Sequence, residues 1–171
     1  MWGECIVGIS SILNIFACPI KKNNMRKIKR IFIHCTASSQ KWGVNNLIQE
    51  FKNKGWRYPG YHIVVTADGK EHSLLSLDKV SNGVNGYNST AINVAYVGGI
   101  DAKGNGVDNR TEAQKETLRA IVTRLKKQFP NAVVLGHRDI SPDLNKNGIV
   151  DPWERIKECP CFNAMDEYKI I

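Results

Sequence analysis

The sequence predicts a single α/β domain in which a central mixed β-sheet is flanked by helices. Its 171 residues suit one domain with its own core. Short apolar segments recur at the length of buried strands, and two of them flank the turn dipeptide Asp68-Gly69, which indicates a β-hairpin. A longer segment, residues 111–129, has the period of an amphipathic helix. Strands and helices in this arrangement favour a sheet with helices packed on its faces.

Five segments are predicted to be strands: residues 29–34, 61–66, 71–74, 92–97 and 132–135. The second and third form the hairpin around Asp68-Gly69. Gly98-Gly99 ends the fourth, because glycine weakens a strand. The fifth strand (AVVL) is apolar at every position, which is typical of a strand in the middle of a sheet.

Two helices are predicted. In residues 44–54 the apolar side chains share one face, and Gly55 follows as the stop. The second helix, residues 111–129, begins with a capping box formed by Thr111 and Gln114. Its apolar stripe has helical spacing and consists of Leu118, Ile121, Val122 and Leu125. Each helix can therefore bury one face against the sheet.

Positive charge is concentrated at the start of the chain. The formal net charge is +8, and residues 1–30 hold six Lys or Arg against one Glu. Such a run is usually a solvated leader or strand entrance, and it could also help the protein approach an anionic surface. No basic stripe with interleaved aromatics recurs in the rest of the sequence, so nucleic-acid binding is not expected.

Residues 1–27 are interpreted as a leader of unassigned status that precedes a domain at residues 28–171. The apolar stretch 6–20 is too short to span a bilayer, so stable membrane insertion is not expected. Positive charges follow this stretch, whereas they precede the apolar region of a signal peptide. The simplest hypothesis is that the natural start is Met25. Five cysteines, without paired spacing, do not indicate a disulfide scaffold.

Two histidines and a cysteine lie at the ends of predicted elements. His34 ends the first strand, His137 follows the last one, and Cys159 precedes Pro160. A catalytic zinc needs about three N, S or O ligands from the protein and an open position for water. Rigid strand ends can hold such ligands in place. The three residues are therefore candidate zinc ligands. Any one of them, considered singly, could instead have a purely structural role.

Six short motifs occur in order along the chain: residues 32–38 (FIHCTAS), 60–64 (GYHIV), 86–88 (GYN), 97–101 (VGGID), 136–139 (GHRD) and 159–162 (CPCF). Together they resemble the type 2 N-acetylmuramoyl-L-alanine amidases, which include phage amidase-lysozymes and the peptidoglycan recognition proteins. The resemblance covers residues 28–162. It implies the α/β fold of that family and hydrolysis of the amide between N-acetylmuramic acid and L-alanine in bacterial peptidoglycan, as in endolysins and autolysins.

The resemblance also implies roles for five residues. His34, His137 and Cys159 would bind zinc, and Tyr61 and Lys157 would be catalytic. Zinc activates water and polarises a carbonyl in such enzymes. Lys157 lies two residues before Cys159, close enough to aim its ammonium at an oxyanion, and its alternative role is that of a surface lysine. Tyr61 begins a strand beside a Pro-Gly bend, and its alternative is the edge of the core.

The other cysteines and histidines lead to further expectations. Cys161 competes with Cys159 as the metal ligand, and the family motif favours Cys159. Cys35 is expected to be a buried thiol on the strand face opposite His34, because neighbouring strand residues point opposite ways. His62 is expected to be packed within the protein or to support a ligand.

The alternative function is a recognition module that binds muropeptide without cutting it. Recognition proteins without catalysis typically lose the cysteine ligand, and this chain retains Cys159. The favoured interpretation is an enzyme, a monomer that acts on cell-wall peptidoglycan, after cytoplasmic accumulation and release if it comes from a phage. Some phage amidases also inhibit phage RNA polymerase, but nothing in the sequence indicates that role. Many relatives carry a His shortly before the GYN motif, where residues 82–84 read NGV.

A calcium loop is also predicted. The segment from Asp143 to Glu154 (DLNKNGIVDPWE) matches the pattern D-x-[DN]-x-[DN]-G-x5-E at every specified position. The oxygen ligands would come from Asp143, Asn145, Asn147, Ile149 through its carbonyl, Asp151 through water, and Glu154. Pro142 blocks an entering helix, so the alternative is an Asn- and Gly-rich surface turn.

Overall fold

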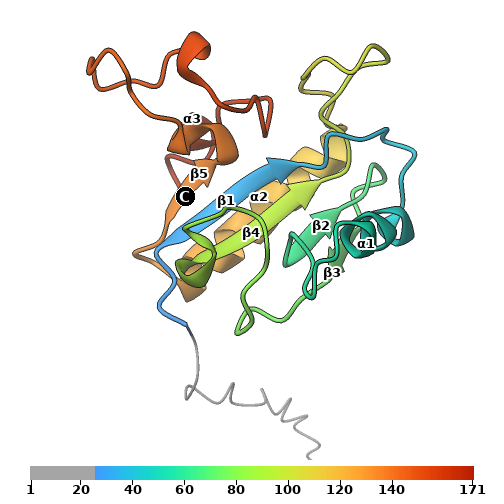
Figure 1. Ribbon diagram of the computed structural model, residues 1–171. Coiled ribbons are helices and arrows are strands. Elements are labelled where there is room, and N and C mark those ends of the chain that lie inside the picture. Colours follow the sequence, from blue (N-terminus) through green and yellow to red (C-terminus); the bar gives the residue numbers. More distant parts are fainter. Residues whose placement is uncertain (1–25) are drawn as a thin grey trace, which may run out of the picture.

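The computed structural model describes residues 26–171, so the predicted leader lies almost entirely outside the described residues, as does Met25. The strands are β1 (Arg30–Cys35), β2 (Ile63–Val65), β3 (Glu71–Ser73), β4 (Ala91–Tyr96) and β5 (Val133–Gly136). The helices are α1 (Val44–Asn53), α2 (Glu112–Gln128) and α3 (Ala164–Glu167), with the short 3-10 turns η1 (Asn88–Thr90), η2 (His137–Ile140) and η3 (Pro152–Glu154). Figure 1 shows their arrangement.

The five strands form one mixed sheet in the order β3-β2-β4-β1-β5. β1 runs parallel to β4 and β5, and β2 runs parallel to β4, whereas β3 is antiparallel to β2. The β2–β3 hairpin turns at Gly69, whose φ of 80° is a conformation that glycine adopts without strain. The predicted α/β fold with a central mixed sheet is confirmed. The four parallel strands have their carboxyl ends on the same side of the sheet. The site lies along these strand ends.

α2 covers one face of the sheet. The Thr111 side chain accepts a hydrogen bond from the Gln114 backbone N–H, and the Gln114 Oε1 accepts one from the Thr111 backbone N–H, so the predicted capping box is confirmed. The apolar stripe of α2 packs on alternate residues of the strands, including Ile33, Val94 and Tyr96. Burial of each such large side chain contributes about 1.5–3 kcal/mol.

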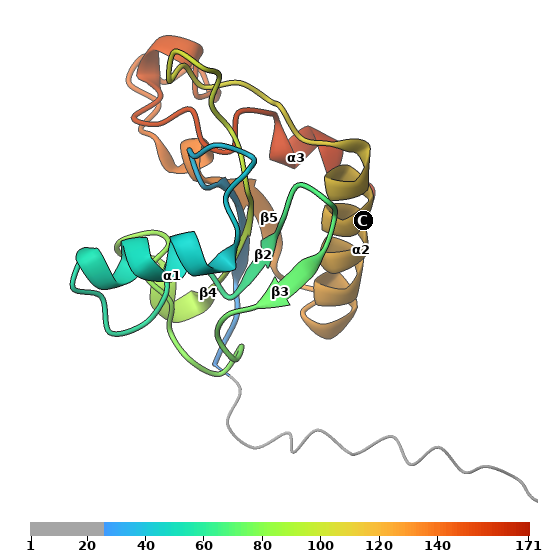
Figure 2. The same cartoon turned by 90° about the vertical axis from the view of Figure 1, so that its right-hand side faces the viewer.

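α1 covers the opposite face (Figure 2). Its Leu47 and Phe51 pack on Val64 and Ala95. The alternation of the strands sends Cys35 into the core on the α2 face, buried as predicted, and leaves His34 on the α1 face. The site therefore lies on the side of the sheet that α1 only partly covers.

β5 does not lie in the middle of the sheet, so that prediction was wrong. The strand pairs only with β1 and forms an edge, where Val133 is 53% exposed. The strand is apolar for a different reason. Although it is an edge strand, it has packed side chains on both of its faces. Val134 packs against the core on the α2 face, and Leu135 packs against the small cluster around Phe32 on the other face.

Within residues 26–171, no helix has the length and apolar character needed to cross a membrane.

Candidate metal centre

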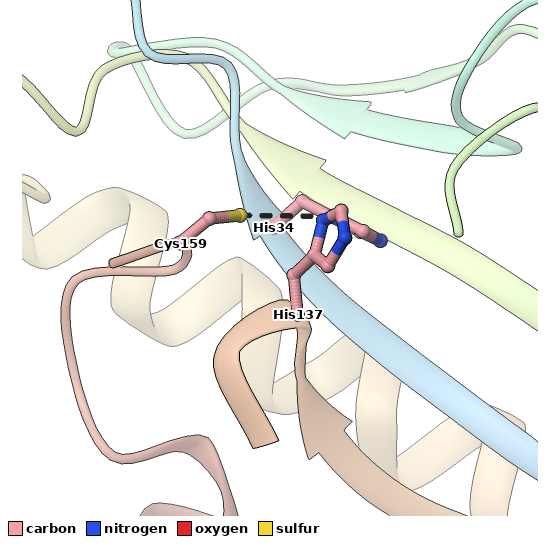
Figure 3. Close-up of side chains that lie close together, drawn as sticks. All are labelled: His34, His137 and Cys159. Carbon is pink, nitrogen blue, oxygen red and sulfur yellow. Dashed lines mark hydrogen bonds between the residues drawn. The ribbon is translucent and has the colours of Figure 1, made fainter. Parts of the chain in front are cut away.

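The three predicted zinc ligands come from separate segments that meet at the carboxyl ends of the parallel strands. His34 lies in β1, His137 is the first residue of η2 directly after β5, and Cys159 lies between η3 and α3. One ligand atom of each residue lies within 4.8 Å of the other two. Figure 3 shows the three side chains converging. Because β1 and β5 are neighbours in the sheet, strand pairing alone brings the two histidines together.

The two ring nitrogens of His34 face different partners. Nδ1 lies 3.6 Å from the Cys159 Sγ, and Nε2 lies 2.9 Å from the Asn93 Oδ1. The His137 ring stands nearly perpendicular to the His34 ring, with 5.0 Å between the centroids. The backbone N–H of Arg138 donates to the carbonyl of Cys159 at 2.8 Å, which ties the cysteine segment to η2.

Both imidazoles are neutral at neutral pH. Burial lowers the pKa of His34 to about 4, and the nearby Lys157 charge adds to this effect. Burial also lowers the pKa of His137 to about 3, with contributions from His34 and Lys157. A neutral imidazole has a free lone pair and is the form that binds a metal.

The donor set and its spacing fit zinc. Two imidazole nitrogens and a thiolate are ligands that zinc prefers, and three protein ligands leave a fourth position open. Tetrahedral zinc would separate a nitrogen and a sulfur ligand by roughly 3.6 Å. The distance between the His34 Nδ1 and the Cys159 Sγ is 3.6 Å. Among residues 26–171, these three form the one group of His, Cys, Asp or Glu with metal-ligand spacing.

Cys161, the competing ligand, lies away from the histidines. Its Sγ donates to the carbonyl of Gly99 at 3.2 Å and lies 3.8 Å from the Sγ of Cys35. Cys161 adopts a φ of 72°, in the left-handed region, and it packs with Cys35 against the core on the α2 face. The geometry therefore brings Cys159, and not Cys161, to the histidines.

Tyr61 and Lys157 line the cleft that ends at the metal-ligand group, a space of about 310 Å³. The Tyr61 ring lies 5.2 Å from the His34 ring, and its hydroxyl lies 3.5 Å from the carbonyl of Cys35. Burial raises the pKa of Tyr61 well above its usual value, so the hydroxyl stays protonated. Lys157 is exposed on the wall of the cleft.

Other walls of the cleft come from α1 and from the segment before the GYN motif. They include Glu50, Phe51, Lys54, Trp56, Asn82 and Gly83. Asn82 and Gly83 form an uncharged part of this lining.

The sequence analysis missed Asn93 as a residue of the site. It is fully buried in β4 beside His34, and its backbone N–H donates to the Nδ1 of His62 at 3.0 Å. His62 is also fully buried and is not in the metal-ligand group, as predicted. The signal that could have revealed Asn93 is a polar residue inside an otherwise apolar strand segment, because such a group needs a partner.

The predicted calcium loop is a hydrogen-bonded turn. Glu154 is 3% exposed. Its carboxylate accepts hydrogen bonds from the backbone N–H groups of Leu144, Asn145 and Asp151. The Asp143 carboxylate accepts from two further backbone N–H groups, at residues 147 and 148. Backbone N–H groups therefore contact the carboxylates at both ends of the motif. The structure gives the calcium prediction no support.

An α/β domain in which two imidazoles and a thiol converge at the end of a cleft has the donor set of the zinc-dependent hydrolases with three protein ligands. The sequence model of the N-acetylmuramoyl-L-alanine amidase family matches residues 24–160, and this chain belongs to that family. It is a peptidoglycan amidase of the endolysin type. The group of His34, His137 and Cys159 is consistent with the zinc site of this family.

Relatives and solved structures agree with this assignment. The endolysin of Klebsiella phage KP32 is 37% identical over 140 residues, which cover 81% of this chain and 83% of that protein. The endolysin of Escherichia phage T7 is 34% identical over 135 residues, 78% of this chain and 80% of that protein. The amidase LysC from Clostridium intestinale superposes with a TM-score of 0.65 at 22% identity, covers 85% of each chain, and shows the shared fold.

Proposed function

We propose that this chain uses a zinc ion held by His34, His137 and Cys159 to hydrolyse the amide bond between N-acetylmuramic acid and L-alanine. The observation that carries this proposal is the meeting of the three donors, from distant parts of the chain, at the end of one cleft. When bound, zinc would lower the pKa of a water molecule toward about 7 and polarise the scissile carbonyl.

The three ligands would set the charge of the centre. The low pKa values of His34 and His137 keep both rings neutral and free of a competing proton at neutral pH. Cys159 would bind as a thiolate, which leaves one net positive charge with a divalent ion. Such a centre is less acidic than one with three imidazoles, so the cleft residues must contribute to catalysis.

Lys157 would supply positive charge for the oxyanion. Amide hydrolysis moves negative charge onto the carbonyl oxygen, and a fixed cation near that oxygen lowers the barrier. Lys157 lies on the same cleft as the ligands, and its charge is already felt at both His34 and His137. A side chain on the exposed rim can reach a substrate that lies along the cleft.

Tyr61 would act as a hydrogen-bond donor and not as a base. Its raised pKa keeps the hydroxyl protonated, and its ring lies close to His34. Tyr61→Phe should retain zinc and lower the rate about tenfold, the value of one hydrogen bond of roughly 1.4 kcal/mol. Steady-state rates on purified peptidoglycan measure this. A variant with the wild-type rate would exclude the hydroxyl from the reaction.

The decisive experiment combines metal analysis of the purified protein with digestion of defined muropeptides, read by mass spectrometry. We expect one zinc per chain and release of a free lactyl-sugar together with an intact stem peptide. Cleavage between sugars or within the peptide would end the amidase proposal. Binding of muropeptide without cleavage by the zinc-loaded protein would instead favour a recognition module.

We also propose that peptidoglycan is the partner and that the domain works as a monomer. Light scattering of the eluted protein should then give a mass near 19.2 kDa. A mass near twice this value would contradict the monomer.

A further inference from the structure

A buried hydrogen-bond network adjoins the metal-ligand group at His34. Its centre is the side chain of Asn93 in β4, which is 0% exposed. The amide oxygen faces the Nε2 of His34 at 2.9 Å, and the amide nitrogen donates to the Ser81 Oγ at 2.8 Å. A weaker contact of 3.4 Å joins the same nitrogen to the Asn88 Oδ1.

These partners fix which end of the amide faces His34. The Nδ1 of His62 accepts the Asn93 backbone N–H, so the Ser81 hydroxyl, 3.2 Å away, donates to that nitrogen and its oxygen is free to accept from Asn93. The Asn88 Oδ1 accepts the backbone N–H of Val84 and is likewise an acceptor. The NH₂ group of Asn93 therefore belongs on their side and the carbonyl oxygen on the other. An amide oxygen can only accept a hydrogen bond. The Nε2 of His34 must therefore carry the proton, which leaves the lone pair on Nδ1, the nitrogen that faces Cys159.

The backbone holds Asn93 in this position from two sides. Its own N–H donates to the Nδ1 of the buried His62 at 3.0 Å. Gly83 lies directly against the amide, and a Cβ at that position would lie 2.3 Å from the Asn93 Cγ. The absence of a side chain at Gly83 therefore makes room for the amide behind His34, so the two residues fit as a pair.

We propose that Asn93 is a positioning residue that holds the His34 ring in the Nε2–H tautomer and aims its Nδ1 lone pair at the metal position. This inference rests on the proposed role of His34 as a zinc ligand. A hydrogen bond to the far nitrogen of a metal-binding histidine fixes the orientation of the ring and removes the cost of selecting a tautomer. Asn93 supplies that bond with a neutral group, which adds no negative charge to a centre that already contains a thiolate.

The first test uses the metal-free wild-type protein, so it does not depend on zinc or on a variant that must fold. Long-range proton–nitrogen NMR spectra distinguish the two neutral tautomers of each histidine. We expect His34 to be in the Nε2–H form. A predominant Nδ1–H form, or an even mixture, would overturn the proposal.

The second test measures zinc affinity by competition with a chelator in three variants. Asn93→Leu keeps the size but removes the acceptor, and we expect zinc binding about 10–100-fold weaker. Asn93→Asp keeps an acceptor oxygen and should restore most of the affinity. The matched control is Val94→Ala, a cavity in the same strand on the opposite face, which should lower the melting temperature and leave zinc affinity close to that of the wild type.

The variant outcomes separate positioning from a general effect on folding. Equal loss of affinity in Asn93→Leu and Val94→Ala, or no recovery in Asn93→Asp, would show a merely structural role and overturn the proposal. Failure of the wild-type protein itself to bind zinc would refute the proposed function, while the tautomer measurement would still decide whether Asn93 orients His34.

Discussion

Two regions of the sequence match metal-binding patterns, and their side chains have different environments in the structure. The metal centre takes His34, His137 and Cys159 from three segments far apart in the chain. The loop from Asp143 to Glu154 matches a calcium pattern within twelve consecutive positions. At the metal centre, the Cys159 Sγ accepts one backbone N–H, from Cys35 at 3.3 Å, and lies 3.6 Å from the Nδ1 of His34. In the loop, the carboxylates are occupied by backbone N–H groups.

The difference shows what each kind of pattern can reveal. A local motif of Asp, Asn and Gly suits a calcium loop, and it also suits a turn in which side chains cap the backbone. Donors that converge from separate strands have no comparable local explanation. Convergence in space is therefore stronger evidence for a metal site than agreement with a local pattern.

Replacing the thiolate should have the largest effect. Cys159→Ser should lose most of the bound zinc and all measurable activity, because a serine hydroxyl is a far weaker ligand than a thiolate. Metal analysis and muropeptide digestion measure both. The control is Cys161→Ser, two residues away, which should keep zinc. Reversed phenotypes would assign the ligand to Cys161.

Lys157→Ala should separate chemistry from metal binding. The ammonium lines the cleft but is not in the metal-ligand group, so zinc content should stay at the wild-type level. The turnover rate should fall on the order of a hundredfold or more, the cost of one lost oxyanion donor. Arg155→Ala, nearby but outside the cleft, is the control and should keep the rate. Full activity of the Lys157 variant would remove this residue from the mechanism.

The loop should contribute to stability and little to chemistry. Glu154→Ala leaves three backbone N–H groups without their acceptor and should lower the free energy of unfolding by about 1–3 kcal/mol. Glu158→Ala, at an exposed carboxylate, should change it by no more than about 0.5 kcal/mol. Denaturant titrations compare the two. Equal stability of both variants would show that the Glu154 hydrogen bonds do not hold the loop.

Calcium should have the smallest effect. Because Asp143 and Glu154 already accept backbone hydrogen bonds, we expect no calorimetric heat and no thermal shift at millimolar calcium. The sequence motif makes the opposite prediction. A calcium-dependent rise in melting temperature that disappears in Asp143→Ala would restore the calcium site and place both regions in the same class.

Local signals in the sequence were sufficient to predict the fold class and most elements. Apolar period, the capping box at Thr111 and the Asp68-Gly69 turn are local signals, and local signals suffice for helices, strands and hairpins to within one or two residues. The family motifs named the candidate ligands and Tyr61 and Lys157. These residues lie in or next to short motifs that can be recognised in the sequence without a structure.

Which residues meet in space depends on the tertiary structure. It set β5 at the edge of the sheet, because an apolar strand can be covered on both faces by residues distant in sequence. It brought Cys159 to the histidines and turned Cys161 toward Cys35. It also revealed Asn93, whose role depends on a hydrogen bond across 59 positions of the chain. Such contacts depend on strand order and packing, which no local stretch of sequence encodes.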